Sequence, residues 1–149
     1  MNKVKERSDL LYIILPVAII AAVMFLLKEK DPDINFCRKV FNGLVSNSSP
    51  AERFIDWKNL KAMDVDVGVR YSGLPDEKQR SDYKKSLFAG FSFGFKQGGG
   101  SPRAFTNWRI YAKDIDKVVV AADYPRYNKT ILFGISKSAK PLLISMQWE

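Results

Sequence analysis

The chain has 149 residues, of which 46% are apolar, and 24 basic against 16 acidic residues give it a formal net charge of +8. It contains no histidine and a single cysteine, which excludes histidine-based catalysis, the common histidine zinc sites and an internal disulfide. We therefore expect one folded domain with no metal and no cofactor. The positive charge favours anionic partners, but the basic residues are scattered, and a solubilising surface is the stronger interpretation.

An apolar run, LLYIILPVAIIAAVMFLL, extends over residues 10–27 without a single charge. As a helix it would be about 27 Å long, close to the hydrocarbon thickness of a bilayer, and it lacks the polar stripe of a soluble core helix. It is too long for the core of a cleaved signal peptide and does not end in small residues. We therefore expect a basic tail at 1–9, a transmembrane signal anchor at 10–27, a linker at 28–33 and an α+β domain at 34–149.

Basic residues flank both ends of this run, so the positive-inside count does not decide its orientation. The short basic tail and the long domain that follows favour a cytoplasmic N-terminus. In a bacterium the anchor would then lie in the inner (cytoplasmic) membrane, with the domain on the periplasmic side.

Two helices are expected next. The first begins near Asp33, because apolar residues and the cysteine recur with a 3.6-residue period; they are Ile34, Cys37, Val40, Phe41, Leu44 and Val45. This pattern indicates that Cys37 is a small buried hydrophobic residue. The second helix is expected from Ser49 to about Met63, because Ser49, Pro50 and Glu52 match a capping box.

Residues 64–71, DVDVGVRY, alternate valine with polar residues, which predicts a strand or an extended connection. A third helix is expected over 75–97, with an aromatic stripe that faces the core: Tyr83, Leu87, Phe88, Phe91 and Phe95. Phe93 lies on the far side of that helix. Gly90 and Gly94 are expected to let the helix approach the sheet closely, and Gly98 to form a left-handed cap.

Four strands are expected at about 105–112, 118–123, 130–136 and 142–148. The short turns between them require antiparallel pairing, so they form a meander. Helices followed by strands predict an α+β fold with helices packed on a curved antiparallel sheet.

The glycine run at 98–100 follows a helix and leads to a strand, which is the wrong order for a phosphate-binding loop. Asp114 and Asp116 suit a hairpin turn better than a metal site. Basic residues among aromatic ones in NWRIY and DYPRY are explained by strand alternation, so we expect no nucleic-acid partner.

The order of elements resembles the cystatin-like cone of the nuclear-transport-factor superfamily. Residues 54–91 also resemble the toluene-tolerance family of phospholipid-binding periplasmic carriers at Ile55, Asp56, Trp57, Tyr71, Pro75, Glu77, Arg80, Phe88 and Phe91. These resemblances imply a cone-shaped α+β domain, and the carrier resemblance implies a lipid ligand. The same fold also occurs in anchored subunits of envelope secretion machines.

Three functions are compatible with these features. The first is a membrane-anchored, non-catalytic interaction domain with an assembly or scaffold role in an envelope complex, in which a sheet face or Phe93 contacts a protein partner. The alternative is an anchored protein that binds a lipid or another apolar ligand. Its pocket would be lined by Trp57, Leu60, Tyr71, Phe88, Phe91, Phe95, Trp108 and Tyr111. The third is an enzyme that uses Asp56 with Tyr71 or Tyr83.

Overall fold

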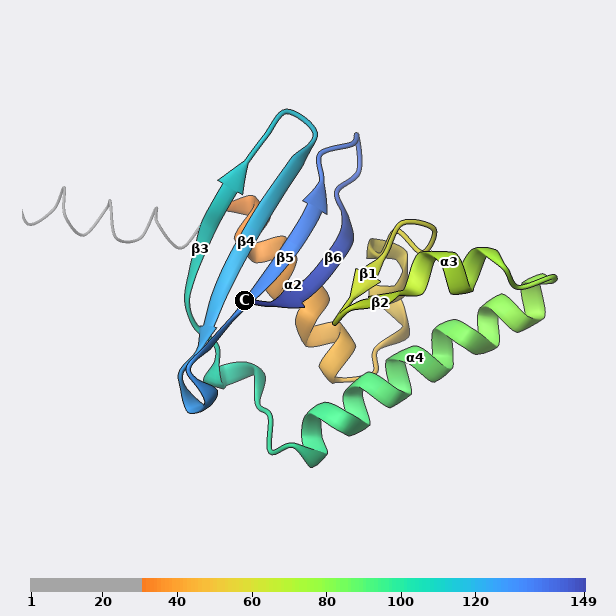
Figure 1. Cartoon of the computed structure of the whole chain (residues 1–149), viewed down its shortest axis with the longest axis horizontal. Coiled ribbons are helices and arrows are strands. Elements are labelled where there is room, and N and C mark those ends of the chain that lie inside the picture. Colours follow the sequence, from red (N-terminus) through yellow and green to blue (C-terminus); the bar gives the residue numbers. More distant parts are fainter. Residues whose placement is uncertain (1–30) are drawn as a thin grey trace, which may run out of the picture. The chain divides into compact units, whose positions relative to one another are not determined.

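The structure is a computed structural model that describes residues 31–149, so the predicted tail and anchor lie outside the described residues. Among the described helices, none combines the length and the hydropathy needed to span a membrane. The described residues form one six-stranded sheet together with several helices (Figure 1). The expected α+β class is confirmed.

The predicted meander is confirmed at nearly the expected bounds. Its strands are β3 (Thr106–Lys113), β4 (Lys117–Tyr124), β5 (Lys129–Ser136) and β6 (Leu142–Trp148), and each pairs antiparallel with the next. Two short strands, β1 (Lys61–Ala62) and β2 (Val65–Asp66), extend the sheet in the order β2-β1-β6-β5-β4-β3. β1 runs parallel to β6, which departs from a purely antiparallel sheet.

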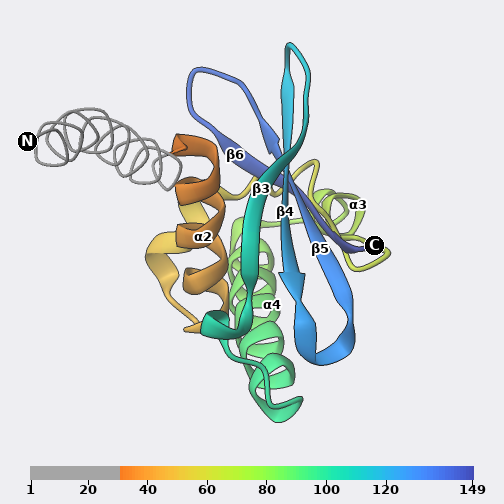
Figure 2. The same cartoon turned by 90° about the vertical axis from the view of Figure 1, so that its left-hand side faces the viewer.

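The first predicted helix is confirmed as α2 (Pro32–Val45), which lies across one face of the sheet (Figure 2). Its Phe41 is 1% exposed and forms the centre of an aromatic cluster. The ring centroid of Phe41 lies 4.9 Å from that of Phe105, 5.5 Å from Phe133 and 6.4 Å from Trp108. This cluster joins α2 to the meander.

The prediction of a second helix is wrong beyond its first turns. Residues Ser49–Phe54 form a 3₁₀ helix, η1, whose N-cap residue makes no side-chain capping bond, and the chain is extended from Ile55. The Asp56 carboxylate accepts hydrogen bonds from the backbone N–H of Lys58 at 3.2 Å and from the Asn59 side chain at 2.9 Å. Such a local turn competes with helix formation, and the backbone N–H of Asp56 bonds instead to the Leu143 carbonyl, 3.0 Å away.

The predicted strand at 64–71 is also wrong for most of its length. Only Val65 and Asp66 are in a strand, and α3 (Val67–Ser72) follows. The Asp66 carboxylate caps α3 by accepting a hydrogen bond from the Val69 N–H at 2.9 Å. Val67 and Tyr71 are buried while Val69 is 69% exposed, so the valines follow the helical period rather than the alternation.

The third predicted helix is confirmed as α4 (Glu77–Gln97), which is capped by Asp76. Its end differs from the expectation, because Gly98 has a φ of −70° and Gly99, with a φ of 68°, is the left-handed residue. The 3₁₀ turns η2 (Pro102–Ala104) and η3 (Pro125–Tyr127) complete the fold.

Candidate functional site

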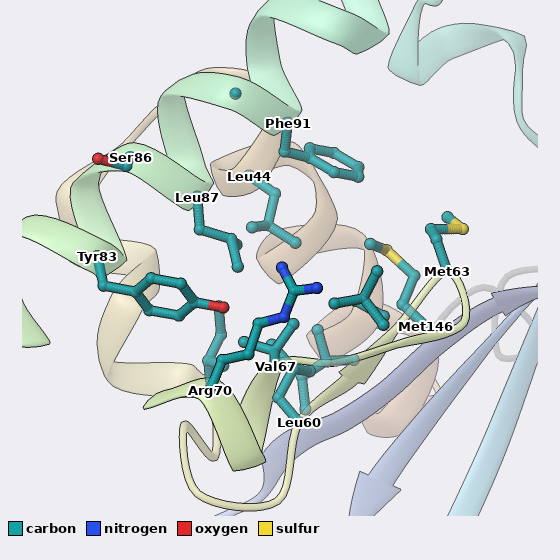
Figure 3. Close-up of a pocket in the computed structure, with 15 residues that line it drawn as sticks. Leu44, Leu60, Met63, Val67, Arg70, Tyr83, Ser86, Leu87, Phe91 and Met146 are labelled. Carbon is teal, nitrogen blue, oxygen red and sulfur yellow. The ribbon is translucent and has the colours of Figure 1, made fainter. Parts of the chain in front are cut away.

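An apolar cavity of about 440 Å³ lies between α4 and the part of the fold that contains β1, β2 and α3 (Figure 3). Its position depends on the small hairpin of β1 and β2, in which Met63 and Asp64 both have positive φ. The residues that line it are Leu44, Ile55, Leu60, Ala62, Met63, Val65, Val67, Arg70, Tyr83, Ser86, Leu87, Gly90, Phe91, Leu143 and Met146.

The cavity exists because α4 packs against α2 on one side, whereas the part of α4 around Gly90 and Gly94 stands away from β1 and β2 on the other. On the packed side, the Ser92 hydroxyl donates a 2.6 Å hydrogen bond to the Val45 carbonyl, and the Phe41 and Phe95 ring centroids lie 5.6 Å apart. On the open side, a Cβ atom added at Gly90 or Gly94 would meet nothing within 4 Å. The expectation that these glycines allow close packing on the sheet is therefore wrong.

A second cavity of about 270 Å³ adjoins the first one along α4. The two share Met63, Gly90 and Phe91 in their linings, and the second continues to Phe95 and Trp148. The stripe of Tyr83, Leu87, Phe91 and Phe95 is partly buried along this path. We call the two adjoining cavities the α4 groove.

Arg70 is the charged residue in the lining of the α4 groove. It lies on α3, and its side chain reaches into the larger cavity, where the Tyr83 hydroxyl points toward it, whereas Ser86 points outward (Figure 3). Within residues 31–149, the Arg70 guanidinium has neither an ion pair nor a hydrogen bond. The α4 groove can therefore accept an apolar chain and offer a cation to an anionic or hydrogen-bond-accepting end.

The structure distributes the eight predicted pocket residues over several environments. Leu60 and Phe91 line the larger cavity, and Phe91 and Phe95 line the smaller one. Trp57, Tyr71 and Phe88 are buried together instead, with the Trp57 ring centroid 5.9 Å from that of Tyr71 and 6.1 Å from that of Phe88. That second cluster fixes the first half of α4 to the segment before β1.

The remaining two predicted residues lie on β3 and do not line the α4 groove. Trp108 belongs to the aromatic cluster around Phe41. Tyr111 is 53% exposed, and its hydroxyl donates a 2.9 Å hydrogen bond to the Glu149 carboxylate, which raises the pKa of Tyr111. Met63, Arg70 and Met146 were not among the predicted pocket residues; the hairpin that positions Met63 was expected to be helix and α3, which carries Arg70, was expected to be strand, whereas Met146 lies on the correctly predicted β6.

The groups considered for catalysis are engaged elsewhere. Asp56 has its carboxylate in the local turn described above, and no hydrogen bond joins it to Tyr71 or Tyr83 within the described part of the chain. Cys37 is fully buried, as expected, and burial, with a smaller effect of the Asp33 charge, raises the pKa of its thiol far above the usual range. Residues 31–149 contain no group of three or more potential metal ligands.

Phe93 lies on the outer side of α4 and is 66% exposed, which confirms that its side chain points away from the core. Its role as a partner contact stays a prediction. Comparison with family models, curated proteins and solved structures found no match to this chain. The family resemblances of the sequence therefore stay predictions, and the α4 groove provides the basis for a functional proposal.

Proposed function

We propose that residues 31–149 form a non-catalytic binding domain that holds an apolar ligand, such as a lipid chain, in the α4 groove. One observation carries this proposal: α4 stands away from β1 and β2 and leaves an apolar groove beside Gly90 and Gly94, where added side-chain atoms would meet nothing. Most ligand pockets are concave and largely apolar, with a few polar groups that orient the ligand. The cavity volumes of about 440 Å³ and 270 Å³ are in the range of small-molecule sites.

Arg70 gives the proposal a chemical direction. An apolar chain in the groove would place its polar end near the unpaired guanidinium and the Tyr83 hydroxyl, both of which can donate hydrogen bonds to an oxygen acceptor. The predicted anchor at 10–27 would keep such a domain beside a membrane. The anchor and the periplasmic location stay predictions.

The test uses residues 31–149 without detergent, because the hydrophobic core from Ile34 to Met146 lies entirely within this segment. The probe is 1-N-phenylnaphthylamine, whose fluorescence rises in apolar surroundings. Gly90→Leu should extend into the α4 groove and weaken probe binding at least tenfold. Ala89→Leu adds the same side chain one position away, on the outer side of α4, and should leave binding unchanged.

A complementary measurement compares this neutral probe with cis-parinaric acid, which carries a carboxylate. Arg70→Gln should weaken binding of the acid several-fold and leave binding of the neutral probe within a factor of two. If the unsubstituted domain binds neither probe, or if Gly90→Leu binds as well as Ala89→Leu, the α4 groove is not a ligand site.

A further inference from the structure

The outer side of α4 presents a row of exposed residues that the fold does not use. Asp82, Lys85, Ala89, Phe93 and Lys96 are all exposed. None of their charged groups forms an ion pair within residues 31–149, and the Phe93 ring has no aromatic or cationic neighbour there. Among residues 31–149, α4 lies at the edge of the fold (Figure 1), and the five residues are exposed along its length.

The spacing of these residues is symmetric about Ala89. Asp82 lies seven positions before Ala89 and Lys96 seven after it, while Lys85 lies four before and Phe93 four after. Seven residues are close to two helical turns and four are close to one, so all five lie on one face of α4, with members of each pair on opposite sides of Ala89. The residue pairs at equal distances from Ala89 are complementary: carboxylate with ammonium, and ammonium with aromatic ring.

Two copies of such a helix match when they are antiparallel. A two-fold axis through Ala89 places Asp82 opposite Lys96 and Lys85 opposite Phe93, and each pairing occurs twice. The first pairing is an ion pair and the second is a cation–π contact. A parallel pair would instead place Asp82 opposite Asp82 and Lys96 opposite Lys96, which is repulsive.

We propose that two copies of this chain associate through antiparallel α4 helices, with Ala89 on the two-fold axis. The small side chains of Ala89 and Ser86 let the two helices approach closely, and the exposed Phe93 ring then packs over the partner's helix. Contact over about four turns buries on the order of 1,000 Å², near the lower limit for a specific interface. We therefore expect a weak, concentration-dependent dimer.

Cysteine cross-linking of the full chain tests this arrangement. Ala89→Cys places two thiols together on the axis, whereas native Cys37 is buried and does not interfere. Mild oxidation should produce a disulfide-linked dimer on a non-reducing gel. The matched control is Ile115→Cys, because Ile115 is 97% exposed at the tip of the β3–β4 hairpin and lies outside the proposed interface. This control should yield at least fivefold less dimer.

Charge reversal in the Ala89→Cys chain then tests the pairing itself. Asp82→Lys places like charges together twice and should lower the cross-linked fraction at least threefold. Adding Lys96→Asp restores opposite charges and should restore the yield. Failure of Ala89→Cys to cross-link, equal yields with and without Asp82→Lys, or no recovery in the double reversal would each overturn the proposal. Circular dichroism of each variant confirms that the exposed substitutions leave the domain folded.

Discussion

Replacing Gly90 and Gly94 by alanine tests the central geometric finding, which is that α4 stands away from β1 and β2. Glycine in a helix interior costs about 0.5–1 kcal/mol relative to alanine, because the unfolded glycine chain is more flexible. At both positions an added Cβ meets no atom within 4 Å. Each substitution should therefore stabilise the domain by about 0.5–1 kcal/mol, without an opposing steric cost.

The two substitutions together should add about 1–2 kcal/mol to the free energy of unfolding, because each replaces a helical glycine and an added Cβ meets no atom within 4 Å at either position. For a domain of this size the midpoint of thermal unfolding should rise on the order of 5–10 °C. Urea unfolding monitored by circular dichroism measures the free energy, and the m-value should stay unchanged, since the same surface is exposed on unfolding.

Gly68 provides the matched control, because its replacement by alanine is measured by the same change in the free energy of unfolding. A Cβ at Gly68 would lie 2.7 Å from the carbonyl carbon of Lys58 and closer still to its oxygen. These are backbone atoms, and the Gly68 N–H also bonds to the Leu60 carbonyl at 2.9 Å. Gly68→Ala should therefore destabilise the domain by about 1–3 kcal/mol. If the substitutions at 90 and 94 destabilise in the same way, α4 packs closely on the fold and the α4 groove is absent.

The remaining predictions concern hydrogen bonds, backbone conformation and titration. Ser92→Ala leaves a buried carbonyl at the end of α2 without its 2.6 Å hydrogen bond and should lower the free energy of urea unfolding by about 1–2 kcal/mol. Gly99→Ala forces a φ of 68° on a residue with a Cβ and should lower the thermal midpoint, whereas Gly98→Ala, at a φ of −70°, should not. Because burial raises the pKa of Cys37, the contribution of its protonated thiol to the free energy of unfolding is complete at neutral pH and is lost as the pH rises above the pKa of the unfolded thiol, about 8.5. This contribution to the decline at alkaline pH, measured by urea unfolding, should disappear in Cys37→Ala. Hydrogen bonds lower the pKa of Asp123, so its stabilising effect is present above the ordinary aspartate pKa and is lost as the pH falls through the lower folded value. The difference between the unsubstituted domain and Asp123→Asn in urea unfolding should therefore shrink under acid conditions.

The sequence predicts the elements whose pattern is long and regular. α2, α4 and the four strands of the meander each contain many residues with a clear period, so local preference and burial agree. The class of the fold follows from their order along the chain. The helical period also places Phe93 off the core stripe, but only the structure shows that no second element packs on it within the described residues and that it is 66% exposed.

The segment between Ser49 and Ser72 could not be predicted in the same way, because its structure depends on partners distant in sequence. Leu143 and Met146 on β6 accept hydrogen bonds from the backbone of Asp56 and Met63, at 3.0 and 2.8 Å. Those contacts hold the chain extended where its local pattern favours a helix. The prediction of the site was affected most, because Arg70 and Met63 belong to this segment and line the α4 groove only as a result of its structure.

The way in which α4 is held explains why its middle is available for binding. At its start, Asp76 caps the helix, and the Arg80 guanidinium donates a 3.0 Å hydrogen bond to the Leu74 carbonyl. At its end, Arg126 and Tyr127 donate hydrogen bonds to the carbonyls of Gly99 and Gly98, at 2.9 and 3.2 Å.

With both ends fixed in this way, the helix needs few contacts in between, and Phe88 and Ser92 are its buried residues. They lie on the side that meets Trp57 and α2. The apolar stripe toward the groove is left half-covered, and Phe93 on the outer side is left exposed. Apolar surface that a fold leaves in contact with water gains free energy when another molecule covers it. For this reason we propose the groove side of α4 as the ligand site and its outer side as the contact with a second copy of the chain.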